Sequence, residues 1–448
     1  MANERGRGQG SPQGGRISDF HDRGHAAFGR ALRQKQMLAT IAYRNIWRNK
    51  RRTFFCLAAV GFAVFFIAFY GGFIEGFSRN INEIVQVFDT GHVRVVSAEF
   101  EADSELMPVQ FPVSGGESAE SLAARIKAVP GVRAVFPRIE TFASLHESAI
   151  RHAMLWGLNV EEEMALNNFN FINRDSGLVE GRFPAPGSNE AAIGRSLAER
   201  TGLAVGDYIP LSAVSAQFSD RHWEPRVTGI FAFDYMRFDE NYIIVDFERL
   251  QRLLVLGGGT QQLVIFADDE RQSASIAAQV QRLLGDGDVA RDWRDNFWVA
   301  VMHMARPMYA LVYMVFLVVA CLLIINTVVM IIHERIKEIG MMGSLGMSRG
   351  EIVTVFFFES VFMSAIGALA GVALGGILTA VGQRFPFRWT DMTGNTFAEF
   401  PASDAVFLSF SVTSLAQAWF MGVIVASIFT LIPSLKSAFV EPVEALRR

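Results

Sequence analysis

Four long apolar stretches constrain this sequence more than any other feature. A helix of about 20 apolar residues crosses the hydrocarbon core of a bilayer, because each helical residue advances about 1.5 Å. Only 19% of the 448 residues are charged and 39 are phenylalanine, which is too apolar for an ordinary soluble protein of this length. The sequence therefore predicts a membrane protein with four transmembrane helices, at residues 54–73, 306–332, 352–381 and 405–433.

Charged residues are distributed unevenly along the chain. Residues 1–53 contain 12 Lys and Arg against 3 acidic residues, whereas residues 74–305 contain 20 basic and 33 acidic residues. Basic residues next to a span remain in the cytoplasm. We therefore expect both termini to be cytoplasmic, with a short tail at 434–448. Residues 74–305 then form a large extracytoplasmic domain, and residues 382–404 form an extracytoplasmic loop.

The segment before the first span divides into two parts. Residues 1–33 are rich in Gly, Arg and Gln and have no apolar periodicity, which predicts a disordered basic cytoplasmic tail. Residues 34–53 carry apolar side chains on one helical face, which is typical of an amphipathic helix on the inner leaflet. A cytosolic extension of the first span is the alternative.

The extracytoplasmic domain has the pattern of a mixed α/β fold. The runs GHVRVV, RHAMLWGLNV and RVTGIFAF predict strands, and SLAERTGL and SASIAAQVQRLLG have helical spacing. Residues 98–120 are polar and contain Pro and Gly, which predicts a long loop. Both cysteines, Cys56 and Cys321, lie within predicted spans, so this domain must be stabilised by a packed core. The predicted fold class is a multi-pass α-helical membrane protein with an α/β domain between spans 1 and 2.

Several patterns of chemical activity are absent from the sequence. No GxxxxGK[ST] loop occurs, so the chain is not expected to bind ATP by that route. His146 and His152 do not have the spacing of a helical zinc pair, and His333 has no second histidine for an HExxH motif. We therefore expect no metal site, and no nucleic-acid partner.

Ser348 permits two interpretations. Residues 346–350 fit the G-x-S-x-G motif of a hydrolase nucleophile, which requires a strand that turns into a helix. Ser348 and Glu351 also fit a helix capping box, in which each side chain bonds the backbone of the other residue. The surrounding pattern of helix, turn and helix favours the cap.

Glu359 is an ionisable residue at the edge of the third span. Such residues suggest proton transfer when they lie inside a membrane. Residues 360–383 are long enough to cross the bilayer without it, so we expect Glu359 near the headgroups, paired with a basic residue.

Three glycines, Gly367, Gly371 and Gly375, recur at every fourth position of the third span. Small residues at this spacing let two helix backbones approach closely in a membrane. They predict a tight helix contact, either within one chain or between two subunits.

The run ERIKEIGMMGSLGMSRGEIVTVFFFESVFMSAIGALAGVALGG resembles the core of MacB-type, FtsX-like permeases of ABC transporters. RNIWRNKRRTFF, AAIGRSLAERTGLAVGDYIPL and EPVEALR extend the resemblance over about residues 38–448. The segment that enters the second span, from ARDWRDNFWVAV onwards, is similar to that of lipoprotein-releasing permeases.

This resemblance implies a coupling helix at residues 333–351, which docks in a groove of a separate ATPase. Ile336, Ile339, Met342 and Leu345 recur on one side of such a helix. The alternative is a re-entrant turn that touches only lipid headgroups. The residues assigned to coupling are Ile336, Glu338, Ile339, Gly340, Met342, Leu345 and Gly346.

The resemblance also implies a function. The chain would be a permease subunit in a bacterial inner membrane, with ATP and Mg²⁺ bound by two partner ATPase subunits and none by this chain. ATP hydrolysis would move the periplasmic domains and release lipoproteins. The implied partners include a second permease copy or paralogue, membrane lipids, and a periplasmic carrier or adaptor. The alternatives are efflux of hydrophobic molecules or peptides, and activation of an envelope hydrolase.

An aromatic stripe on the first span suggests where acyl chains would bind. Its members fall at steps of three and four, and could line a cavity between this span and the second span of a partner subunit. Lipid-facing phenylalanines are the alternative. The stripe comprises Phe62, Phe65, Phe66, Phe69 and Phe73.

Overall fold

The structure is a computed structural model that describes residues 40, 50–103, 107–113, 118–145, 152–166, 177–334, 336–388 and 403–438. The predicted N-terminal tail and most of the predicted interfacial helix lie outside these residues. So do most of the loop at 382–404 and the last ten residues of the chain. The described residues form two compact units. The helical unit comprises residues up to 71, 310–378 and from 410 onwards, and the α/β unit comprises residues 72–309 and 379–409.

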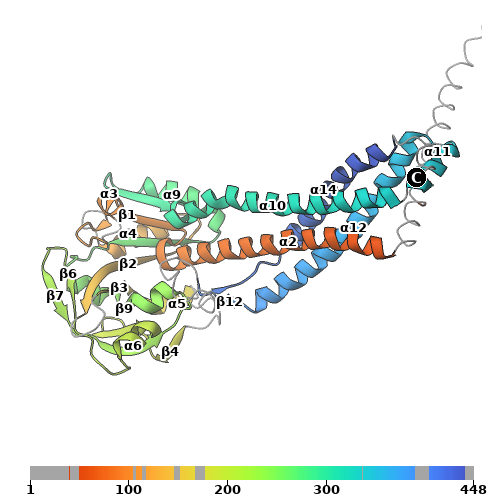
Figure 1. Ribbon diagram of the computed structural model, residues 1–448. Helices are drawn as coiled ribbons and strands as arrows, with labels where there is room; N and C mark the ends of the chain where they lie inside the picture. The colour runs from red at the N-terminus through yellow and green to blue at the C-terminus, as the bar shows by residue number, and fades with distance from the viewer. Residues whose placement is uncertain are drawn as a thin grey trace, which may run out of the picture. The chain divides into compact units, whose positions relative to one another are not determined.

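The helical unit is built from long apolar helices (Figure 1). Its helices are α2 (Lys50–Ile84), α10 (Phe297–Glu334), α11 (Ile336–Ser344), α12 (Arg349–Arg384) and α14 (Val412–Ala438), of which α2, α10 and α12 also supply residues to the α/β unit. Among the described residues, four helical segments are long and apolar enough to cross a membrane. They are Thr53–Thr90, Phe297–Val319, Arg349–Arg384 and Val412–Leu431. This result confirms the four predicted spans.

Two helices begin at residues that differ from the predicted starts of their spans. α10 begins at Phe297, well before residue 306, because the side chain of Asn296 accepts a hydrogen bond from the backbone N–H of Trp298 (2.9 Å) and caps the helix. Pro307 lies inside α10. α14 begins at Val412 and not at residue 405, because β13 (Ala405–Val406) pairs with β12 (Phe387–Arg388).

The segment between the second and third spans is also shorter than its predicted range of 333–351. α10 continues to Glu334, α11 occupies Ile336–Ser344, and α12 already begins at Arg349. Gly346 has a left-handed backbone (φ +94°) that side chains rarely adopt, so the chain turns there between α11 and α12.

The α/β unit contains a mixed sheet in which the strand order is β11-β1-β10-β2-β3-β9-β5-β8-β4, with β6 and β7 attached beside β2. The strands are β1 (Val93–Ser97), β2 (Val132–Leu145), β3 (His152–Leu158), β4 (Leu178–Gly181), β5 (Glu190–Gly194), β6 (Leu211–Val214), β7 (Asp220–Trp223), β8 (Arg226–Phe231), β9 (Tyr242–Asp246), β10 (Gln262–Ala267) and β11 (Asp288–Asp292). Strand β2 joins two lobes, because residues 132–138 pair with β10 and residues 139–144 pair with β3.

Short helices surround this sheet. They are α3 (Ala98–Ala102), α4 (Ala119–Lys127), α5 (Val160–Leu166), α6 (Arg195–Thr201), α7 (Met236–Asn241), α8 (Phe247–Leu253) and α9 (Ser273–Gln281). In addition, η1 (Val85–Thr90) is a π-helix, and η4 (Glu270–Gln272) and η5 (Trp293–Asp295) are 3-10 helices. The predicted loop at 98–120 is therefore partly helical. α3 forms there because Ser97 Oγ accepts a hydrogen bond from the N–H of Phe100 (3.1 Å), whose side chain is buried.

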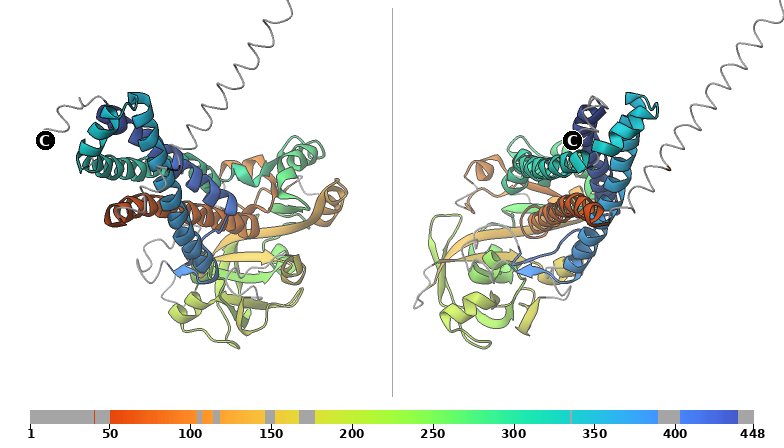
Figure 2. Two further views of the ribbon diagram at one scale, coloured as in Figure 1. Left: turned by 90° about the vertical axis from the view of Figure 1, so that its right-hand side faces the viewer. Right: turned by 45° about the vertical axis from the view of Figure 1, so that its right-hand side comes forward.

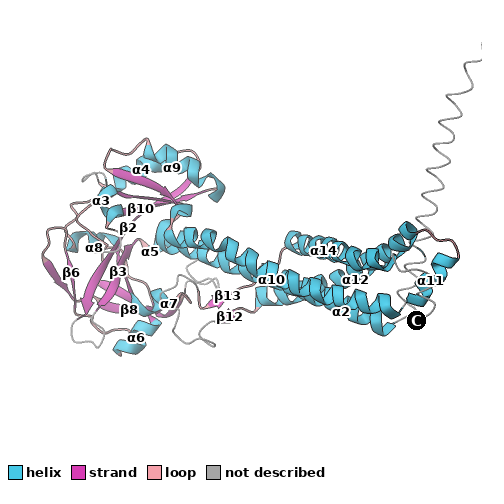
Figure 3. Ribbon diagram, turned by 45° about the horizontal axis from the view of Figure 1, so that its top comes forward, coloured by secondary structure: helices cyan, strands magenta, loops and turns pink. Residues whose placement is uncertain are grey.

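The first lobe packs α4 and α9 against β1 and β10, and Figure 3 shows both helices on the same side of these strands. Val93 and Val95 of β1 lie in its buried core, together with side chains from both helices. Because successive residues of a strand point to opposite faces, Arg94 lies on the other face of the sheet.

The second lobe is centred on β3 and β9, which are parallel and almost entirely buried. Buried parallel strands carry apolar side chains on both faces. Ile243 and Val245 belong to a core that α6 and α8 cover, whereas Tyr242 and Ile244 belong to a second core that includes residues of η1 and α7. The predicted strands in GHVRVV, RHAMLWGLNV and RVTGIFAF are present as β1, β3 and β8.

Candidate functional site

Helix α11 presents a small apolar surface to solvent. Met341 lies in α11, and Leu345 directly follows the helix. The N–H of Leu345 donates to the carbonyl of Met341 (3.0 Å), which continues the helical turn, and the side chain of Leu345 is 85% exposed. Beside Met341 in the sequence, Gly340 is buried, and Met342 is partly buried and packs against the core of the helical unit. Met341 and Leu345 therefore form an exposed apolar surface at the end of α11, to which the predicted coupling residue Met342 contributes less.

The other predicted coupling residues are placed as follows. Ile336 is half-buried and Gly346 is exposed, whereas the side chains of Glu338 and Ile339 lie outside the described part of the structure. The turn to α12 is closed by a capping interaction at Ser348. Its backbone N–H donates to Glu351 Oε2 (2.7 Å), and its Oγ accepts from the N–H of Glu351 (3.4 Å). This reciprocal pairing is the geometry of a capping box.

The three glycines of α12 lie against α2 of the same chain. A Cβ atom added to Gly371 would be 2.3 Å from the carbonyl oxygen of Gly61, and one added to Gly367 would be 2.9 Å from that of Leu57. A Cβ atom on Gly375 would lie 2.8 Å from the Cβ of Ala68. Figure 2 shows α12 crossing α2. Of the two alternatives for this contact, the structure therefore has the one within a single chain.

The aromatic stripe of α2 is not a uniform surface. Phe62 is 61% exposed, whereas Phe65 and Phe69 are half-buried and stack on each other at a ring-centre distance of 6.2 Å. Phe66 stacks on Phe316 of α10 at 5.1 Å. Phe66 is thus engaged in a contact within its own chain.

Two further predicted residues lie apart from these. Phe73 belongs to the α/β unit, where it stacks on Phe77 at 6.2 Å. Glu359, in α12, is only 2% exposed and is therefore enclosed by protein, and its position near the headgroups stays a prediction.

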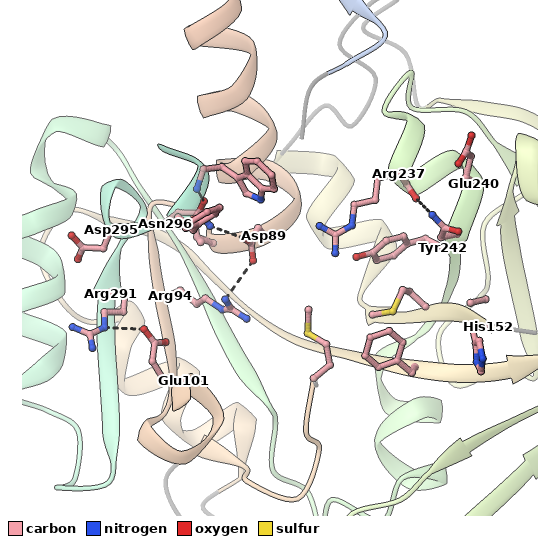
Figure 4. A pocket seen from close by; sticks show the side chains of 18 of the residues that line it. Asp89, Arg94, Glu101, His152, Arg237, Glu240, Tyr242, Arg291, Asp295 and Asn296 are labelled. Carbon is pink, nitrogen blue, oxygen red and sulfur yellow. Dashed lines mark hydrogen bonds and ion pairs between the residues drawn. The ribbon is translucent and has the colours of Figure 1, made fainter. Parts of the chain in front are cut away.

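The α/β unit contains an open cavity that local sequence patterns do not reveal. Its volume is about 1000 Å³, and its walls come from η1, β1, β2, β3, α7, β11 and the start of α10. Figure 4 shows Arg237 and Tyr242 on one side, with Asp89 and Arg94 across from them. Because the lining residues extend from Asp89 to Trp298, only the register of the sheet brings them together.

A buried polar cluster lies behind this cavity, around a chamber of about 70 Å³. The hydroxyl of Tyr242 donates to the carboxyl of Glu140, and both side chains are buried. Removal from water disfavours a charged carboxylate, so burial raises the pKa of Glu140. In α7, burial raises the pKa of Asp239 to about 7, and this carboxyl group accepts a hydrogen bond from the N–H of Phe233 (2.8 Å).

A buried arginine anchors the end of η1. Arg138 of β2 donates to the carbonyls of Val87 (2.8 Å) and Phe88 (3.2 Å), and its Nε donates to Glu163 Oε1 (3.1 Å). Neither charged side chain is exposed to solvent. The guanidinium carbon lies 5.0 Å from the ring centre of Trp156. The pair thus fixes the η1 backbone to the centre of the sheet.

Within the described ranges, no group of three or more His, Cys, Asp or Glu side chains is placed to hold a metal ion. The exposed surface of α11 is suited to a protein partner, and the mixed lining of the cavity is suited to a polar ligand.

Two family models match the chain. The MacB-like periplasmic core domain matches residues 53–283, which is more than half of the sequence, and the FtsX-like permease C-terminal domain matches residues 310–442. The chain belongs to the MacB-type, FtsX-like family of ABC transporter permeases. This assignment confirms the resemblance seen in the sequence. It also identifies the permease as a protein of a bacterial inner membrane.

Individual relatives align to different extents. The permease is 23% identical over 337 residues to the lipoprotein-releasing system transmembrane protein LolC of Xylella fastidiosa (strain 9a5c), covering 71% of this chain and 78% of that protein. It is 29% identical over 125 residues to the macrolide export ATP-binding/permease protein MacB of Nitrobacter winogradskyi, covering 28% of this chain and 17% of that protein. The extracellular domain of the ABC-type transporter YknZ from Gram-positive bacteria has a TM-score of 0.31 and 15% identity, covering 45% of this chain and 99% of that domain.

Proposed function

We propose that this permease is a subunit of an ABC transporter that releases lipoproteins from the inner membrane. The main support is the extent of the LolC alignment, which covers 71% of the chain, whereas the MacB alignment covers 28%. In this proposal, ATP hydrolysis moves the periplasmic α/β unit, and this movement drives release. Efflux of hydrophobic molecules or peptides is the second candidate.

ATP binding belongs to a separate ATPase in this proposal, since the sequence has no GxxxxGK[ST] loop. Two ATPase subunits bind ATP and Mg²⁺, and each holds the α11 helix of one permease subunit in a groove. Met341 and Leu345 supply the apolar contact. Because α11 lies between α10 and α12 in the sequence, with short connections on both sides, a movement of α11 is passed to both helices.

The acyl chains of the cargo require a second permease copy or paralogue. The exposed face of Phe62 and the half-buried rings of Phe65 and Phe69 form one wall of the proposed cavity. The other wall is α10 of the partner, and in this chain Leu311 and Val315 of α10 are more than half exposed. Phe66 contributes less, because it stacks on Phe316. A periplasmic carrier or adaptor then accepts the cargo.

This proposal places both termini in the cytoplasm. The excess of basic residues before the first span and the four spans support that orientation. Single cysteines at Ser118 and at Arg448 test it with a membrane-impermeant reagent. In intact cells, Ser118→Cys should react and Arg448→Cys should not.

Depletion of the permease tests the proposed substrate. Fractionation of the inner and outer membranes should then show lipoproteins retained in the inner membrane. An unchanged distribution of lipoproteins, together with lower resistance to a hydrophobic toxin or peptide, would instead support efflux. An unchanged distribution with reduced cell-wall hydrolysis would support activation of an envelope hydrolase.

A further inference from the structure

Four arginines line the cavity of the α/β unit, namely Arg94, Arg200, Arg237 and Arg291. Arg94 forms an ion pair with Asp89 (3.4 Å), and Arg291 forms one with Glu101 (3.2 Å). For Arg237, no carboxylate of the described residues lies within ion-pair distance. Figure 4 shows its guanidinium directed into the cavity.

Two carboxyl groups act on Arg237 beyond ion-pair distance, and both are engaged by other residues. Glu140 accepts a hydrogen bond from the hydroxyl of Tyr242, and burial raises the pKa of Glu140. Asp89 pairs with Arg94 and accepts a hydrogen bond from Asn296 (2.7 Å). Arg237 is half-buried, and a guanidinium that is partly removed from water gains from an anionic partner that can accept its hydrogen bonds. The cavity therefore offers a site for an anionic group at Arg237.

Apolar side chains line the same cavity. Met107, Phe142 and Met154 line the cavity, and Phe142 is 48% exposed although it lies within β2. Exposed aromatic side chains inside a concave surface are typical of binding sites, because a ligand can remove them from water. A ligand that fits Arg237 and this apolar surface has an acidic group beside an apolar one.

The charges of the remaining lining favour one class of ligand. Besides the four arginines, five carboxylates line the cavity, so its surface carries charges of both signs. The carboxylates are Asp89, Glu101, Glu240, Asp292 and Asp295. Lining residues of both signs suit a polypeptide, which has both donors and acceptors along its backbone.

We propose that this cavity binds an extended polypeptide segment in which an acidic side chain adjoins an apolar one. Arg237 pairs with the acidic side chain, and Phe142 contacts the apolar one. The volume of about 1000 Å³ is at the upper end of the range for ligand pockets, which leaves room for several residues. This inference goes beyond the transport function and does not depend on it.

Fluorescence anisotropy with the full-length permease in detergent tests the proposal. The probes are two fluorescein-labelled octapeptides, Gly-Ser-Glu-Phe-Ser-Glu-Phe-Gly and the same peptide with Gln in place of both Glu residues. We expect the Glu peptide to bind about tenfold more tightly, which corresponds to about 1.4 kcal/mol. Arg237→Gln should remove that preference. Arg226→Gln, an exposed arginine of β8 outside the cavity lining, should preserve it.

A second variant keeps the test decisive if Arg237→Gln fails to fold. Phe142→Ser changes a half-exposed side chain, and should weaken the binding of both peptides without lowering the unfolding temperature. Equal affinities for the two peptides, or a preference that persists in Arg237→Gln, would overturn the proposal. Unchanged affinities in Phe142→Ser would also overturn it. Displacement of the Glu peptide by phosphatidylglycerol micelles, but not by excess unlabelled Glu peptide, would assign the cavity to a lipid phosphate instead.

Discussion

The two units of the permease depend on different interactions. In the helical unit, small residues bring α12 to α2 at backbone distance, so that a Cβ on Gly371 would lie 2.3 Å from Gly61 O. In the α/β unit, charged groups such as Arg138 and Glu163 are fully buried beside the sheet. The helical unit should therefore be sensitive to changes of side-chain volume, and the α/β unit to changes of charge.

This difference follows from the solvent that each unit meets. In a lipid bilayer, the hydrophobic effect does not drive apolar helices to associate, so close packing of the helices must stabilise their association. Water drives the apolar residues of the α/β unit into a core, and a polar group enclosed there must be hydrogen-bonded or paired.

The largest effect is expected for Arg138→Met. This change leaves the carboxylate of Glu163 buried without its partner and removes two donors from the η1 carbonyls. Loss of one member of a buried pair commonly costs about 3–5 kcal/mol. Denaturant unfolding followed by tryptophan fluorescence should show this loss. The control is Arg138→Met combined with Glu163→Leu, which leaves no unpaired charge and should recover part of the stability. Equal stability of the wild-type protein and Arg138→Met would contradict this account of the α/β unit.

A smaller loss is expected for Gly371→Ala in the helical unit. The new Cβ meets a backbone carbonyl that cannot move away alone, and overpacking of this kind typically costs about 1–3 kcal/mol. The apparent unfolding temperature of the purified permease in detergent should fall. Gly350→Ala in the same helix is the matched control, because nothing lies within 4 Å of its Cβ position. If both variants unfold at the same temperature, close packing of α12 on α2 is not what stabilises the unit.

Leu345→Asp should affect binding but not folding, since this side chain is 85% exposed. Loss of an apolar anchor in an interface commonly costs about 2 kcal/mol or more, so less ATPase should co-purify with the variant. The unfolding temperature should remain that of the wild-type protein. Phe218→Asp, which changes an exposed apolar side chain of the α/β unit, should leave the ATPase bound. Normal recovery of the ATPase with Leu345→Asp would remove the proposed role of α11.

The smallest effect is a pH dependence confined to the α/β unit. The pKa of Asp239 is about 7 in the folded protein, whereas the ordinary value for an exposed aspartate is 3.8. Since the folded-state pKa is raised, the contribution of this group to stability is full below about pH 4 and is lost as the pH rises to 7. Asp239→Asn keeps an acceptor for the N–H of Phe233 but cannot ionise. At pH 8 this variant should be more stable than the wild-type protein by about 1 kcal/mol or more. The difference should disappear near pH 4, and a difference that is independent of pH would refute the assignment to Asp239.

Features encoded by neighbouring residues could be predicted from the sequence. The four spans depend on the length of apolar runs, and the strands β1, β3 and β8 depend on local alternation. The start of α10 could not be placed in this way, because the Asn296 cap that sets it lies outside the apolar run.

Features that depend on contacts between residues far apart in the sequence could not be predicted from local sequence patterns. The spacing of the glycines in α12 predicts a close contact, but only the structure identifies α2 as the partner. Helical spacing groups Met342 with Leu345, whereas packing partly buries Met342 and leaves Leu345 85% exposed. The residues that line the cavity around Arg237 are brought together only by the register of the whole sheet, which local patterns do not specify.

The central claim is that this permease uses a separate ATPase to release lipoproteins. The most direct measurement uses proteoliposomes that contain the permease, the ATPase that co-purifies with it, and a radiolabelled lipoprotein. With a periplasmic extract as acceptor, ATP should transfer the lipoprotein to the soluble fraction, and a non-hydrolysable ATP analogue should not. Proteoliposomes with Leu345→Asp should release little lipoprotein. Equal release with and without ATP hydrolysis, or ATP-dependent transport of a hydrophobic toxin with no release of lipoprotein, would contradict the claim.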